Sequence, residues 1–141
     1  MNFESMKYAF ALCSLLVLTT IPVFAHDLEK DKNVGALFHI EPDDQPKAGV
    51  PVEGWFEIRK KGGNSITAQD CSCIVKLYSG KPKPTAKPIG EYTLSGEERV
   101  TAKFMFPSPG PYTVQLSGKP KKGSKVALNP FQINWSVRVV P

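Results

Sequence analysis

The stretch Phe131-Gln132-Ile133-Asn134-Trp135-Ser136-Val137-Arg138-Val139 alternates apolar and polar side chains without a break. Successive side chains of a β-strand point to opposite faces, so this pattern predicts a strand with one buried face and one solvated face. The same alternation recurs along most of the chain, and no segment has an apolar period long enough to indicate a helix. The sequence therefore predicts an all-β protein.

Six further strands are predicted upstream of this stretch, at 34–40, 52–58, 71–78, 91–94, 100–106 and 112–116. Clusters of Gly, Pro, Asn, Asp and Ser separate them, as expected of turns. A half-apolar sheet must bury its face against another layer, so about seven strands fit an immunoglobulin-like antiparallel β-sandwich. Within it, Pro109-Gly110-Pro111-Tyr112 resembles the turn and tyrosine that open the penultimate strand of such sandwiches.

The first 25 residues have the three parts of a cleavable signal peptide. Lys7 precedes an apolar run at 8–20, and Val23-Phe24-Ala25 supplies a cleavage site. The run is shorter than the roughly 20 residues of a spanning helix. We therefore expect a signal peptide at 1–25, a loose N-terminal segment at 26–32 and a sandwich domain at 33–141. The expected location is the periplasm or the extracellular medium, with a thylakoid lumen as a further option.

The chain is basic, with 18 Lys and Arg against 13 Asp and Glu. The cations gather in the loop segments 59–61, 81–87 and 119–125, where lysines protect strand edges from aggregation. Alternatively, they attract an acidic partner or make peripheral contact with a membrane surface. We expect no nucleic-acid partner for an exported chain. We also expect no enzyme, because no histidine is placed by the sequence to activate a serine.

Several motifs resemble those of known proteins. They are Val34-Gly35-Ala36-Leu37-Phe38-His39-Ile40-Glu41-Pro42-Asp43-Asp44-Gln45-Pro46-Lys47-Ala48-Gly49, Lys61-Gly62-Gly63, Asp70-Cys71-Ser72-Cys73 and Leu116-Ser117-Gly118-Lys119-Pro120. Together they resemble a group of small exported cyanobacterial proteins of unassigned activity. More distantly, the entry into a strand at Ala48-Gly49 and the segment 109–116 resemble FixH/YtkA-like immunoglobulin-like domains. Some of those occur beside copper-handling or oxidase-assembly proteins, so the resemblance implies a link to copper but no catalytic residue.

Cys71 and Cys73 are the two thiols that remain after removal of the signal, and an export compartment favours a disulfide. In an ideal strand their Cα atoms would lie about 6.6 Å apart, so a bond implies a bulge, a turn or stored strain. A strained bond could cycle between dithiol and disulfide. Alternatively, the thiols stay unpaired, or they form half of a Cu(I) site with His39 or Met105 as third ligand. The alternation of its strand argues against Met105.

His26 would become the first residue after cleavage, with a free amine and an imidazole that together chelate copper. With His39 as a third nitrogen this would make a histidine brace for Cu(II). The alternative is that His26 merely follows the cleavage site and His39 is an ordinary strand residue bonded to a backbone carbonyl.

These observations predict an exported, non-enzymatic binding or interaction module. It would dock on another exported or membrane protein through its strand edges, Trp55 and its basic loops. Copper is its candidate cofactor. The alternative function is a periplasmic copper-binding or thiol-redox accessory protein that uses the Cys71–Cys73 pair.

Overall fold

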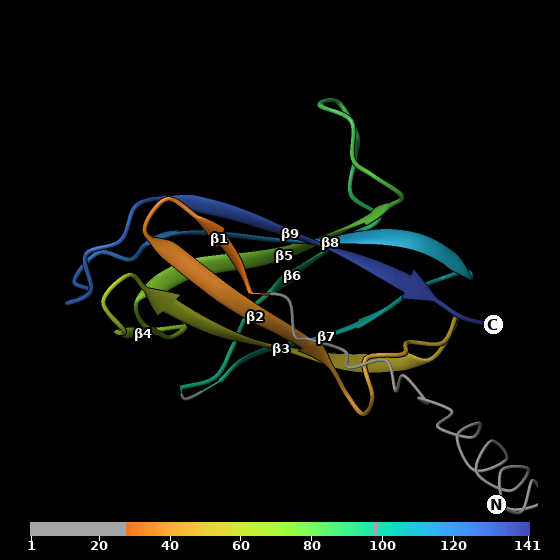
Figure 1. Ribbon diagram of the computed structural model, residues 1–141, viewed down its shortest axis with the longest axis horizontal. Helices are drawn as coiled ribbons and strands as arrows, with labels where there is room; N and C mark the ends of the chain where they lie inside the picture. Colours follow the sequence, from red (N-terminus) through yellow and green to blue (C-terminus); the bar gives the residue numbers. More distant parts are fainter. Residues whose placement is uncertain (1–27, 98) are drawn as a thin grey trace, which may run out of the picture.

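The computed structural model describes residues 28–97 and 99–141, which form strands and no helix. The alternating segments pair into two antiparallel sheets (Figure 1). The strands are β1 (Glu29–Asp31), β2 (Val34–Ile40), β3 (Pro51–Lys60), β4 (Ser65–Ile66), β5 (Cys71–Ser79), β6 (Gly90–Thr93), β7 (Val100–Met105), β8 (Gly110–Pro120) and β9 (Phe131–Val139).

The first sheet has the order β1-β2-β3-β4, and β7 also pairs with β3. The second sheet has the order β6-β5-β8-β9. Figure 1 shows the two sheets stacked, with β2, β3 and β7 in one layer and β5, β8 and β9 in the other. This arrangement is a β-sandwich, as the sequence predicts.

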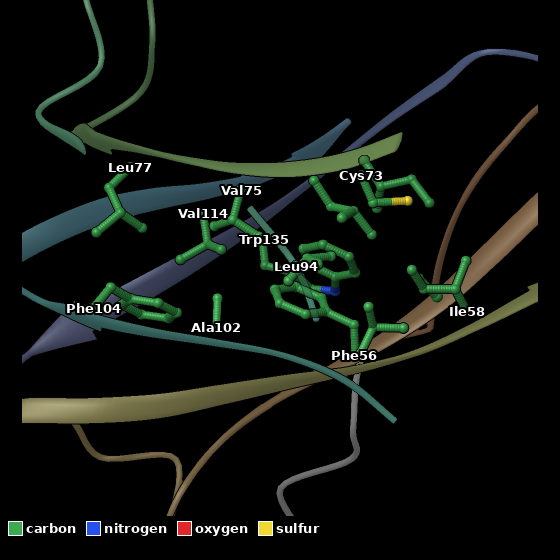
Figure 2. Close-up of a cluster of buried hydrophobic side chains, with 14 of the residues drawn as sticks. Phe56, Ile58, Cys73, Val75, Leu77, Leu94, Ala102, Phe104, Val114 and Trp135 are labelled. Atoms are coloured by element: carbon green, nitrogen blue, oxygen red, sulfur yellow. The ribbon is translucent and has the colours of Figure 1, made fainter. Parts of the chain in front are cut away.

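The apolar positions of both sheets point into the space between them (Figure 2). Phe56 and Ile58 of β3 face Val75 of β5, and each of the three is at most 2% exposed. Trp135 of β9 reaches across the layers, with its ring centroid 5.7 Å from that of Phe56. Burying each large apolar side chain stabilises the fold by about 1.5–3 kcal/mol, so the alternation of each strand sets which face turns inward.

Tyr112 fastens the turn before β8 to the body of the sandwich. Its hydroxyl donates a hydrogen bond to the Ser108 carbonyl at 2.9 Å, and the Ser108 N–H donates back to it at 3.3 Å. Its ring meets the Phe106 ring edge-on at a centroid distance of 5.0 Å. The turn and tyrosine that the sequence singles out therefore form one hydrogen-bonded unit.

Two short strands differ from the sequence-based expectation. Glu29–Asp31 lies in the segment predicted to be loose, but it pairs as β1 with Val34–Ala36. Ser65–Ile66 pairs as β4 with Ile58 and Arg59. Both are held by main-chain hydrogen bonds to the edge of a longer strand. Such bonds do not depend on the type of side chain, so the sequence shows no alternation there. The predicted signal peptide and His26 lie outside the described residues.

The described residues form no helix that is long and apolar enough to cross a membrane.

Candidate functional site

Cys71 and Cys73 are joined by a disulfide at the start of β5. Their Cα atoms lie 5.4 Å apart, within the usual range for such bonds. The pairing with β8 stays regular through both residues. The bond therefore forms without a bulge in β5. Both side chains turn into the core and are 2–3% exposed. Neither sulfur atom is therefore offered to a ligand at the surface.

His39 does not meet this pair. It lies on the outer face of the first sheet, directly opposite Trp55 of β3, whereas the cysteines point inward from the second sheet. Met105 also faces away from the core and is 45% exposed. Across residues 28–97 and 99–141, no three His, Cys, Asp or Glu side chains gather closely enough to hold a metal ion. The structure thus separates the proposed Cu(I) ligands that it describes.

Trp55 is enclosed by neighbours on its own sheet. The His39 ring stacks on it at a centroid distance of 4.0 Å, and the Arg99 guanidinium carbon lies 4.4 Å from its centroid. The indole N–H donates a hydrogen bond to the Glu41 carboxylate at 2.9 Å. Since its polar group is bonded and its ring has two stacked neighbours, Trp55 is a fixed element of the sheet surface.

His39 has an acidic partner beyond its strand. Its Nδ1 atom lies 3.3 Å from a carboxylate oxygen of Asp44, and the other oxygen of Asp44 accepts the Ile40 N–H at 2.6 Å. Asp44 therefore caps the end of β2 and contacts the imidazole at the same time. As an ordinary strand residue, His39 was expected to bond a backbone carbonyl. The Asp44 carboxylate was not foreseen as its partner.

A groove of about 840 Å³ opens on the outer face of the first sheet, where β1, β2 and β3 meet. Leu28, Gly35 and Leu37 supply apolar lining, and Leu28 is 67% exposed. Lys30, Lys60 and Lys61 line the same groove. We call this feature the lysine-rimmed groove.

The three lysines differ from the other cations of the groove. Arg59 is bound to Glu57, with 2.6 Å between Nη2 and the carboxylate, and Lys32 donates to the Pro130 carbonyl. No described residue forms a hydrogen bond or ion pair with the side chain of Lys30, Lys60 or Lys61. The charges of these three lysines are therefore not neutralised by an ion pair with a described carboxylate.

The turns at this end of the sandwich carry most of the net positive charge of the described residues. The segments 28–33, 59–64, 67–70 and 119–130 lie at one end of the sandwich, on the left of Figure 1. They contain nine cations against three carboxylates, whereas the rest of the described chain has eight cations and seven carboxylates. We call these four segments the basic end. Its cations are Lys30, Lys32, Arg59, Lys60, Lys61, Lys119, Lys121, Lys122 and Lys125.

Main-chain hydrogen bonds tie these four segments together in two pairs. The Lys61 N–H donates to the Asn33 carbonyl at 2.7 Å, which links the β3–β4 and β1–β2 turns. The Lys121 N–H donates to the Asp70 carbonyl at 2.9 Å, which links the β8–β9 and β4–β5 connections. The lysines of the basic end are therefore carried on backbone whose position is set by several strands.

Asp70 is the polar centre of this end. Its carboxylate accepts the N–H and the hydroxyl of Thr67, both at 3.0 Å, and the Ser124 hydroxyl at 3.1 Å. The Thr67 N–H hydrogen bond is the main cause that lowers the pKa of the Asp70 carboxyl below 3.8. The ionised carboxylate thus fastens the β8–β9 loop to the start of β5.

The sequence points to the basic loops and to Trp55 but not to the groove between them. Leu28 and Lys30 fall in the segment predicted to be loose, and Leu37 lies on the face of β2 that alternation assigns to solvent. One signal was present: Leu37 is a large apolar residue at a solvent-facing position of its strand.

Comparison of the chain with protein-family models, with curated proteins and with solved structures finds no match.

Proposed function

We propose that this chain is an exported, non-enzymatic interaction module whose binding surface is the basic end with its lysine-rimmed groove. The partner is an acidic segment of another exported or membrane protein, with apolar side chains that enter the groove. The observation that carries this proposal is the excess of positive charge at the basic end, together with an open groove there that Leu28 and Leu37 line.

Charge and apolar surface contribute differently to such a complex. A cluster of like charges raises the rate of encounter with an acidic partner and disfavours basic ones. Leu28 and Leu37 offer the apolar contact that limits dissociation, because they are the large apolar side chains of the groove that the core does not cover. A volume of about 840 Å³ lies within the range of roughly 300–1,000 Å³ that is usual for ligand-binding sites.

The compartment and the fold family belong to the same proposal. The N-terminal sequence supports export to the periplasm, the extracellular medium or a thylakoid lumen. The Cys71–Cys73 disulfide is the kind of bond that persists in an oxidising compartment. The hydrogen-bonded Tyr112 turn supports an immunoglobulin-like sandwich, and with it the FixH/YtkA-like resemblance.

The test uses the protein purified from an exporting host and a synthetic peptide of alternating Glu and Leu residues. We expect binding that weakens steeply with salt, and that falls at least about tenfold when Lys30, Lys60 and Lys61 are all changed to Gln. The matched control changes Lys81, Lys83 and Lys87 to Gln, which removes the same charge from the connection between β5 and β6, outside the basic end.

Two results would contradict the proposal. Equal loss in both triple variants would show that only net charge matters. Binding to phosphatidylglycerol vesicles but not to the peptide, with the same dependence on Lys30, Lys60 and Lys61, would assign the basic end to peripheral membrane contact instead.

A second candidate function is Cu(II) binding by His26 and His39. The ground for this candidate is the sequence, in which His26 would become the first residue after removal of the predicted signal peptide. His26 itself lies outside the described residues. The test is Cu(II) titration of protein that begins at His26. Adding one residue before His26, or changing His39→Gln, should abolish tight binding, and unchanged affinity would reject the brace.

A further inference from the structure

The outer face of the second sheet carries a separate groove of about 540 Å³, away from the basic end. Its lining includes Lys81 and Pro82 after β5, Pro111 of β8, and Asn134, Ser136 and Arg138 of β9. None of its lining residues is a carboxylate. This composition differs from that of the lysine-rimmed groove, because two prolines and short polar side chains take the place of leucines in the walls.

The three β9 residues reach the groove because of strand periodicity. Asn134, Ser136 and Arg138 occupy alternate positions, so all three point away from the core, and each is exposed. In the register with β8, Ser136 lies opposite Thr113 and Arg138 lies opposite Pro111. An amide, a hydroxyl and a guanidinium therefore follow one another along one strand face.

Lys81 is brought to the same place by two hydrogen bonds of the preceding residue. The Gly80 N–H donates to the Pro111 carbonyl and the Thr113 hydroxyl donates to the Gly80 carbonyl, both at 2.8 Å. Gly80 has a φ of 66°, a conformation that glycine adopts without strain. The following Pro82 has a fixed φ, so the backbone on both sides of Lys81 is restrained.

The cations of this groove are not matched by acids. Elsewhere on the sheets, Lys76 pairs with Glu91 at 3.1 Å and Lys103 lies 3.9 Å from Glu53. Within the part of the chain that the structure describes, neither Lys81 nor Arg138 makes an ion pair or a hydrogen bond through its side chain. Two positive charges thus line a cavity whose other side chains are all neutral.

We infer that this groove binds a small molecule that carries a phosphate monoester. Arg138 offers the planar pair of donors that suits two oxygens of one phosphate, and Lys81 adds a second charge. Asn134 and Ser136 supply neutral donors beside them. Two cations balance the charge of about −1.5 to −2 that a phosphate monoester has near neutral pH. The volume exceeds that of phosphate alone, so the remainder of the ligand lies against Pro82 and Pro111.

The experiment is an NMR titration of ¹⁵N-labelled protein purified from an exporting host. The probes are inorganic phosphate and glycerol 3-phosphate at constant ionic strength, with glycerol and acetate as the neutral and monoanionic controls. We expect saturable shifts of the Lys81, Ser136 and Arg138 amides with both phosphates, tighter binding of glycerol 3-phosphate, and no saturation with glycerol or acetate.

Single variants decide whether the two cations do the binding. Arg138→Gln and Lys81→Gln should each raise the dissociation constant at least about tenfold, because each removes a charge-assisted contact. Lys83→Gln is the matched control, since Lys83 is exposed in the same loop but does not line the groove. Equal effects of Lys83→Gln and Lys81→Gln, shifts confined to the basic end, or no saturable shift at all would each overturn the inference. The amide spectra of the unliganded variants show directly whether they are folded.

Discussion

Gly118 lies directly opposite Cys73 in the β5–β8 pair, and the space that its missing side chain leaves is filled by the Cys73 sulfur and the Phe131 ring. A Cβ atom at position 118 would lie 2.9 Å from Cys73 Sγ and 2.5 Å from two atoms of the Phe131 ring. Both neighbours are buried in the core, where close packing leaves no room for displacement. The glycine is therefore required by its neighbours on both flanking strands.

Gly118→Ala is expected to destabilise the fold by about 1–3 kcal/mol, the usual cost of an added methyl group in a packed core. The measurement is the free energy of unfolding in urea. Gly35→Ala is the control, because a Cβ there would lie 3.6 Å from Leu28, which is an ordinary contact. If both variants lose the same stability, the loss comes from replacing glycine with alanine in a strand and not from the contact with Cys73.

The Cys71–Cys73 disulfide should resist reduction while the protein is folded. A reductant needs access to one of the sulfurs, and both side chains are 2–3% exposed. Mild dithiothreitol followed by alkylation and peptide mass spectrometry should find Cys71 and Cys73 unmodified in buffer and fully alkylated in urea. Ready alkylation in buffer would favour the thiol-redox function over a structural bond.

Replacing both Cys71 and Cys73 with Ala should cost about 1.5 kcal/mol or more. Closing so short a loop removes little entropy from the unfolded chain, which gives roughly this value, and the lost sulfur atoms leave a void in the core. Urea unfolding of the double variant measures the cost. An unchanged free energy of unfolding would mean that neighbouring side chains refill the space.

The stability of the basic end should fall in acid because of Asp70. The pKa of this carboxyl is lowered in the folded state below the unfolded value of 3.8, chiefly by the Thr67 N–H. The stabilisation is therefore complete above pH 3.8 and is lost as the pH falls through the lower folded pKa. Asp70→Asn should flatten the dependence of the unfolding free energy on pH in that range.

The control for this prediction is Glu97→Gln in the β6–β7 connection, an exposed carboxylate with no hydrogen bond to a described residue. It should leave the acid limb of the stability curve as it is in the parent protein. Identical curves for the parent and Asp70→Asn would show that the Thr67 and Ser124 hydrogen bonds do not depend on the charge.

Tyr112→Phe should destabilise the protein by about 1–2 kcal/mol, because it removes the hydroxyl that bonds the Ser108 carbonyl and N–H. Tyr92→Phe is the matched control, since the Tyr92 hydroxyl has no hydrogen bond within the described residues and its ring keeps the Phe104 contact at 5.7 Å. Thermal unfolding of both variants separates the two cases. Equal melting temperatures would show that the turn is held by its prolines instead.

The long strands were predictable because each buries one face, so that every second side chain is apolar. The segments 34–40 and 131–139 match β2 and β9, and 71–78 differs from β5 by one residue, whereas β8 extends at both ends beyond the predicted segment 112–116. β1 and β4 were not predictable, because three and two residues are too few for a period. Their pairing depends on the free edge of a strand that the chain forms elsewhere.

The candidate site divides in the same way. The sequence indicates Trp55, the basic loops and the Cys71–Cys73 pair, because each is a property of one short segment, but only the structure shows that the two cysteines are bonded. It cannot indicate that Arg99 and His39 both contact Trp55, or that the cysteines and His39 face different sides of the sandwich. Those relations join residues of different strands.

Residue order alone determined which side of β3, β7 and β9 turns away from water, since two neighbouring side chains must point in opposite directions whatever the strand pairs with. The folded arrangement alone decided which strands lie side by side, and hence that lysines from distant turns surround Leu28 and Leu37. Which strands become neighbours depends on how well two apolar faces cover each other. The free energy of that packing comes from both sheets together and not from any single segment.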